Sequence, residues 1–178
     1  MNPLAANLPA FPNKSMPYTY EQQTVARKVV VVTGGTTGIG RAIAYRLVAA
    51  GANVLILGRN EDHLNDALEE IRSAGEGEVY GFTTDLSDAE NIKRVFQEAD
   101  ARLGGVDILV NNAALPANSI LDSDYSQWEY IVRTNLLGYM ACCREAIDRM
   151  AVKGGGHIVN IGSMSAVVRE ADSDIYVA

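Results

Sequence analysis

The glycine-rich segment from Thr33 to Gly40 has the composition of a phosphate-binding turn. It reads TGGTTGIG and follows a run of β-branched residues. A helix N-terminus offers free backbone N–H groups and a partial positive charge, which suit an anionic pyrophosphate. Glycine is required where the backbone must approach the phosphate without an intervening side chain. A tight strand-to-helix connection is the alternative. We predict a dinucleotide site formed by Gly34, Thr36, Thr37, Gly38, Ile39 and Gly40.

The end of the next apolar run indicates which dinucleotide would bind. Sites that prefer NAD place an acidic residue roughly 20 residues further along the chain, where it binds the ribose 2′-hydroxyl. Gly58 stands at that position here, and Arg59 follows it. A planar guanidinium suits the 2′-phosphate of NADP. The sequence therefore favours NADP, with NAD as the alternative if Arg59 is only a solvated loop charge.

Further polar residues follow the later apolar runs, and each has an ordinary structural explanation when taken alone. Asp85 could cap a helix, Asn135 could lie on a helix surface, Ser163 could be a loop serine and Tyr176 a surface aromatic. A tyrosine hydroxyl can also donate a proton to a carbonyl oxygen. Its reference pKa near 10 must then fall by roughly 3 units, or about 4 kcal/mol, to act near neutral pH. Nearby positive charge must supply most of that change.

Taken together, these segments resemble the short-chain dehydrogenase/reductase family. The turn has the family's spacing TGxxxGIG, and the segment 111–114, NNAA, is similar to the family's NNAG with Ala114 in place of glycine. Ser163 and Tyr176, 13 residues apart, match the family's catalytic pair. The resemblance covers residues 28–178, roughly two-thirds of a typical member.

The resemblance implies an enzyme that interconverts a carbonyl and a secondary alcohol of a small-molecule substrate by hydride transfer. Tyr176 would be the acid or base, Ser163 would position the substrate oxygen and Asn135 would hold a water in the proton relay. Asp85 would reach the adenine amino group, helped by the backbone of Leu86. The segment 112–114 would line the cofactor, through Asn112, Ala113 and Ala114.

Strands that alternate with helices must position these residues. Continuous apolar runs predict strands over 28–33, 53–57, 79–83, 106–110 and 157–161. Helices are predicted over 41–50, 61–74, 87–103 and 123–152, the third beginning in a capping box of Ser87 and Glu90. This alternation predicts an α/β fold with a doubly wound parallel sheet, Rossmann-like. The resemblance implies the strand order 3-2-1-4-5, with the family's later strands missing from this chain.

Composition narrows the class of protein. Residues 1–27 carry four of the five prolines and are predicted to be an irregular extension, whereas residues 28–178 form the dinucleotide-binding domain. A net charge of −7 argues against partners such as nucleic acid or an anionic membrane. Cys142 and Cys143 are adjacent and unsuited to a disulfide, which favours a reducing cytoplasm. Neither His63 nor His157 belongs to a pattern that would bind a metal.

Two expectations concern assembly. Apolar residues on more than one face of the helix 124–152 predict a homo-oligomer formed through that helix. The chain ends two residues before the position of the lysine in the family's YxxxK, the main source of positive charge near the tyrosine. We therefore expect that residues 1–178 do not fold and work alone, and that further residues or a second chain carry the missing part. A non-catalytic dinucleotide-binding or assembly fragment is the alternative function.

Overall fold

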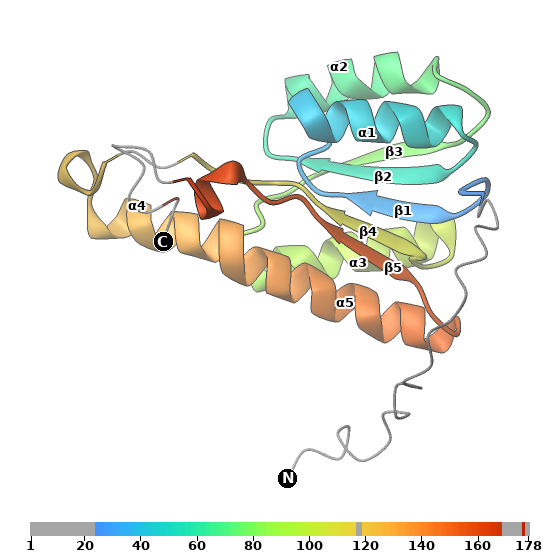
Figure 1. Ribbon diagram of the computed structural model, residues 1–178. Coiled ribbons are helices and arrows are strands. Elements are labelled where there is room, and N and C mark those ends of the chain that lie inside the picture. Colours follow the sequence, from blue (N-terminus) through green and yellow to red (C-terminus); the bar gives the residue numbers. More distant parts are fainter. Residues whose placement is uncertain (1–23, 117–118, 169–175, 177–178) are drawn as a thin grey trace, which may run out of the picture.

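Five parallel strands form a single sheet with helices on both faces (Figure 1). The computed structural model describes residues 24–116, 119–168 and 176, so the predicted N-terminal extension lies almost wholly outside them. The strand order is β3-β2-β1-β4-β5, which confirms the predicted α/β class and sheet order. The strands are β1 (Val29–Val32), β2 (Asn53–Gly58), β3 (Val79–Thr83), β4 (Ile108–Asn111) and β5 (His157–Asn160).

The sheet separates two apolar cores, because side chains alternate between its faces along each strand. Val30 and Val32 of β1 face one core, and Val31 faces the other. The helices of the first core are α1 (Gly38–Ala49) and α2 (Glu61–Arg72), and those of the second are α3 (Ala89–Leu103) and α5 (Gly138–Val152). Figure 1 shows these pairs on opposite faces. The whole of β1 is buried, so the turn that follows it is held at the centre of the sheet.

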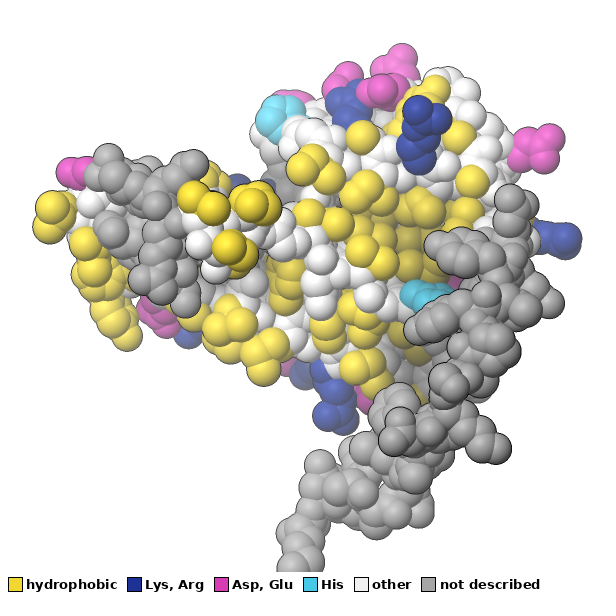
Figure 2. Space-filling view, in the orientation of Figure 1, with side chains coloured by type: hydrophobic (Ala, Val, Ile, Leu, Met, Phe, Trp, Pro, Cys, Tyr) yellow, Lys and Arg dark blue, Asp and Glu magenta, His cyan; other side chains and the backbone are white. Residues whose placement is uncertain are grey.

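The sheet is less completely covered by helices near β5 than at its centre. Figure 2 shows hydrophobic side chains gathered on the open face beside α1. Val159 of β5 is 45% exposed, and the other residues of this strand are exposed or half-buried. Among the described residues no helix combines the length and the apolar character needed to cross a membrane.

The start of α3 differs from the sequence prediction. Asp88, not Ser87, is the N-cap, and its Oδ1 accepts hydrogen bonds from the backbone N–H groups of Glu90 at 2.8 Å and Asn91 at 3.3 Å. The predicted capping box of Ser87 and Glu90 is therefore wrong. An aspartate one residue later satisfies the free N–H groups of the first turn, as a short carboxylate at an N-cap does. Ser87 instead donates its backbone N–H to Asp85 Oδ1 at 2.9 Å.

The predicted continuous helix over 123–152 consists of three parts. α4 (Tyr125–Val132) begins in a capping box formed by Asp124 and Gln127. A π-helical turn follows over Arg133–Leu137, and α5 continues from Gly138. A π turn adds one residue to the helical repeat and often occurs at functional positions. Asn135 lies in the middle of this turn, so the extra residue sets the direction in which its side chain points.

Replacing Phe96 tests the packing of the second core. Its side chain is completely buried, so Phe96→Ala should lower the free energy of unfolding by about 3–5 kcal/mol through lost burial and the cavity left behind. Urea denaturation of the full-length protein measures the change. Leu121→Ala, at a side chain 89% exposed, is the control and should change stability by less than about 0.5 kcal/mol. Similar losses in both variants would contradict the described packing.

Candidate functional site

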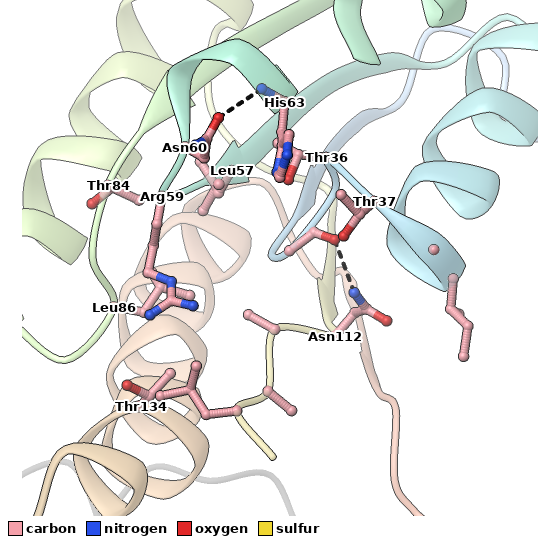
Figure 3. Close-up of a pocket in the computed structure, with 17 residues that line it drawn as sticks. Thr36, Thr37, Leu57, Arg59, Asn60, His63, Thr84, Leu86, Asn112 and Thr134 are labelled. Carbon is pink, nitrogen blue, oxygen red and sulfur yellow. Dashed lines mark hydrogen bonds between the residues drawn. The ribbon is translucent and has the colours of Figure 1, made fainter. Parts of the chain in front are cut away.

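A cavity of about 390 Å³ opens where the carboxyl ends of the strands meet (Figure 3). Ligands of open α/β sheets bind at this edge. Most of the predicted cofactor-binding residues line the cavity: Gly34, Thr36, Thr37, Gly38, Ile39, Arg59, Leu86, Asn112, Ala113 and Ala114. Gly40 lies beside the turn, and Asp85 lines a neighbouring cavity of about 350 Å³ that shares Arg59 and Thr84. Gly58, which the sequence analysis placed at the ribose position, also lines the cavity. The sequence analysis missed the remaining lining residues, which are Leu57, Asn60, His63, Thr84, Leu115 and Thr134.

The turn after β1 has the backbone that a phosphate site requires. Gly34 and Gly38 have φ values of 63° and 52°, in the left-handed region that favours glycine. A Cβ added to Gly40 would lie 2.1 Å from the carbonyl oxygen of Gly34, so no larger residue fits there. Thr37 is the N-cap of α1 but makes no side-chain capping hydrogen bond, and the first turn carries no acidic residue. The N–H groups at this helix start therefore face the cavity without a capping side chain.

Thr33 and Asn112 fix this turn to the end of β4. Thr33 Oγ1 accepts hydrogen bonds from the backbone N–H groups of Asn112 at 2.9 Å and Ala113 at 3.0 Å. Asn112 Nδ2 in return donates to the carbonyl oxygens of Thr33 and Gly34, each at 3.1 Å, and Figure 3 shows its side chain turned toward the glycine-rich segment. Among the described non-glycine residues, Arg27 alone has a positive φ, so Ala114 replaces the family's glycine without left-handed backbone.

Three polar side chains form a chain of hydrogen bonds at the cavity edge. Arg59 Nη1 donates to the hydroxyl of Tyr130 at 2.7 Å, and that hydroxyl donates to Asp85 Oδ2 at 2.8 Å. Burial pushes the pKa of Asp85 upward, but hydrogen bonds from Ser87 and Tyr130 and the charge of Arg59 outweigh it and lower the pKa overall. Asp85 is therefore a carboxylate near neutral pH. Sequence reasoning missed Tyr130, because no motif marks it.

Asn135 holds the wall of the cavity. Its Oδ1 accepts the backbone N–H of Leu115 at 2.8 Å, and its Nδ2 donates to the carbonyl oxygen of the same residue at 2.9 Å. The π-helical turn thereby fixes the segment that follows β4. This contact leaves the predicted water relay untested. Thr134, the preceding residue, lines the same cavity and has a buried hydroxyl. Neither this hydroxyl nor that of Thr84 has a hydrogen-bond partner among the described residues.

The predicted catalytic pair lies beyond β5. Ser163 is exposed, and its Oγ accepts the backbone N–H of Ser165 at 3.1 Å. Tyr176 is helical and half-buried, whereas 169–175 and 177–178 are outside the described residues. Burial, and secondarily the neighbouring Tyr176, raise the pKa of Tyr139 to about 12. The Tyr139 hydroxyl in turn lies 3.5 Å from the carbonyl oxygen of Ile161, two residues before Ser163. Tyr139, in the first turn of α5, thus contacts the segment before Ser163 and interacts electrostatically with Tyr176.

The comparison with protein families gives an extended match. A family model described as short chain dehydrogenase matches residues 28–178. A protein of Thermotoga maritima described as an uncharacterized oxidoreductase is 38% identical over 152 residues, which cover 85% of this chain and 59% of that protein. The chain thus spans a little more than half the length of the curated relatives it matches.

Two solved structures with a similar fold contain dinucleotides. A metagenomic short-chain oxidoreductase in complex with NADP aligns with a TM-score of 0.81 and 31% identity, over 87% of this chain and 71% of that one. An NAD⁺-bound xylitol dehydrogenase aligns with a TM-score of 0.81 and 25% identity, over 87% of this chain and 60% of that one.

Replacing Thr33 tests the link between β1 and β4. Thr33→Val keeps the shape but leaves the backbone N–H groups of Asn112 and Ala113 without their acceptor. Each unsatisfied buried donor costs about 1–3 kcal/mol, so urea denaturation should show a loss of at least 1 kcal/mol. Thr33→Ser retains the oxygen and should recover most of that loss. Equal stability of the valine and serine variants would show that the hydroxyl does not hold the two strand ends together.

Proposed function

Because the chain belongs to the short-chain dehydrogenase family, we propose that the protein is an NADP-dependent oxidoreductase that interconverts a carbonyl and a secondary alcohol. The observation that carries this proposal is the cavity at the carboxyl end of the sheet, bounded by the glycine-rich turn and by Arg59. The proposed enzyme includes whatever the full-length protein adds to this chain.

The lining of the cavity suits a dinucleotide. Gly34 and Gly40 have no room for a side chain against the neighbouring backbone and Asn112, which keeps the turn tight. The space beside Gly38 is open, so an anionic pyrophosphate could approach the N–H groups at the start of α1. Arg59 follows β2 and lines the cavity, so it could bind a ribose 2′-phosphate, and the adjoining Gly58 offers no carboxylate to compete with a phosphate. These features support NADP over NAD.

The chemistry would take place at the nicotinamide end of the cofactor. A nicotinamide bound in the cavity would supply or accept the hydride. Tyr176 would donate the proton to the substrate oxygen or remove it, Ser163 would hold that oxygen by a hydrogen bond, and Asn135 would fix the neighbouring wall through Leu115. Proton transfer of this kind needs positive charge nearby, and we assign that role to the lysine that the family resemblance implies four residues after Tyr176.

The alternative is a non-catalytic dinucleotide-binding or assembly fragment. The family match across 28–178, together with the presence of Asn135, Ser163 and Tyr176, favours the enzyme. A homo-oligomer formed through 124–152 is part of the proposal, because apolar side chains lie exposed along this helical region at Val132, Leu136, Met140 and Ile147. The small-molecule substrate and the cytoplasmic setting also remain proposals.

Replacing Tyr176 tests the proposed chemistry. Tyr176→Phe should reduce kcat by about 10²–10⁴-fold with a ketone substrate, because the proton donor is removed while the ring remains. The dissociation constant for NADPH should stay within about twofold of the wild-type value, by fluorescence titration. Tyr125→Phe, at a tyrosine 74% exposed on α4, is the control and should retain activity. Full turnover by the Tyr176→Phe variant would refute the mechanism.

Replacing Arg59 tests the cofactor preference. Arg59→Ala should weaken NADPH binding by about 10–100-fold, since charge-assisted hydrogen bonds to a phosphate are lost. NADH lacks that phosphate, so its dissociation constant should change by less than about threefold, as measured by isothermal titration calorimetry. Arg46→Ala removes the same charge from an exposed position on α1 and serves as the matched control. An equal loss for NADPH and NADH would contradict the assignment of NADP.

A further inference from the structure

The hydroxyl of Tyr130 joins three separate elements at the cavity edge. Arg59 comes from the end of β2, Asp85 from the segment after β3 and Tyr130 from α4. The hydroxyl lies 2.7 Å from Arg59 Nη1 and 2.8 Å from Asp85 Oδ2. Arg59 Cζ lies 6.0 Å from the ring centroid, so the guanidinium stands at the hydroxyl end of the tyrosine. Arg59 is an exposed side chain, yet its end is held by Tyr130.

The direction of each hydrogen bond in this network is fixed. A phenol has a single hydrogen, and a carboxylate only accepts, so Tyr130 donates to Asp85 and receives the N–H of Arg59. The other oxygen of Asp85 accepts the backbone N–H of Ser87. Burial and the hydrogen bond to Asp85 raise the pKa of Tyr130 despite the opposing charge of Arg59. The hydroxyl therefore keeps its hydrogen at neutral pH.

We propose that Tyr130 is a positioning residue that sets selectivity for the 2′-phosphorylated cofactor. Its hydroxyl stands between Arg59 and Asp85 and occupies one nitrogen of the guanidinium. The remaining N–H groups of Arg59 can then receive a phosphate as a two-pronged fork. Without the hydroxyl, the flexible arginine would sample other rotamers or pair directly with the Asp85 carboxylate, and less of it would face the cavity. The inference rests on the proposed role of Arg59 in binding the 2′-phosphate.

Tyr130→Phe in the full-length protein is the direct test, because phenylalanine keeps the ring and removes the hydroxyl. The dissociation constants of NADPH and NADH are measured by isothermal titration calorimetry. We expect NADPH to bind about 3–10-fold more weakly, since ordering one free long side chain has a cost of this size. NADH should change by less than about twofold, and kcat at saturating NADPH should be unchanged, which also reports an intact fold. Tyr125→Phe, on the same helix, should leave both constants unchanged.

Combining Tyr130→Phe with Arg59→Ala separates this inference from the proposed function. If Tyr130 acts through Arg59, its loss should add less than about twofold in the Arg59→Ala background. Equal weakening of NADPH and NADH by Tyr130→Phe, or the same weakening with and without Arg59, would overturn the positioning role. If Arg59→Ala is selective for NADPH and Tyr130→Phe has no effect, only the role of Tyr130 fails. If Arg59→Ala spares NADPH, the NADP assignment fails and the role of Tyr130 with it.

Discussion

Four hydrogen bonds between Thr33–Gly34 and Asn112–Ala113 hold the site together. They join the ends of β1 and β4, which are neighbours in the sheet although about eighty residues separate them along the chain. Thr33 is buried and its partners are half-buried, so competing water is limited around these bonds. The glycine-rich turn is tied to β4 by this link and to β2 by the hydrogen bond from Gly35 N–H to the Leu57 carbonyl oxygen at 2.9 Å. The surrounding cavity wall, from Asn112 to Leu115, is fixed at its other end by Asn135.

Charge at the site opposes the charge of the whole protein. The chain carries a net charge of −7, yet the helix start that faces the cavity has no acidic residue in its first turn, and Arg59 adds a cation at the edge. Asp85, a carboxylate close to this cation, accepts hydrogen bonds from Tyr130 and Ser87. An anionic ligand would therefore meet local positive potential within an acidic protein. Such local fields, more than net charge, decide what a cleft binds.

Sequence patterns predicted the sheet and most of the cavity lining because both depend on local composition. Unbroken β-branched runs mark buried strands, and glycine spacing marks the turn, so β1 to β5 and the residues around Gly34 to Gly40 were foreseeable. The cap of α3 was misplaced by one residue because Ser87 and Asp88 both suit an N-cap, and only the packed geometry selects Asp88. The π-helical turn at Asn135 has no periodic signature.

Contacts between distant segments could not be predicted from the sequence for a different reason. Nothing in the local sequence distinguishes Tyr130 from other half-buried helix residues. Its hydrogen bonds to Arg59 and Asp85 depend on where α4 lies in three dimensions. Thr84 and Thr134 line the cavity through the same kind of long-range approach. Motifs can mark residues whose role is set by neighbours in the chain. They cannot mark residues whose role is set by the crossing of elements.

The link between Thr33 and Asn112 also fixes when the site can form during synthesis. The glycine-rich turn, α1 and Arg59 all leave the ribosome well before β4 does. Until Asn112 and Ala113 emerge and pair beside β1, the turn keeps its hydrogen bond from Gly35 N–H to the Leu57 carbonyl but lacks every bond that ties it to β4. A nascent chain that ends before β4 would carry an incomplete cavity, because Asn112, Ala113 and Ala114 line it. Binding of the proposed cofactor would therefore report on the assembly of the centre of the sheet.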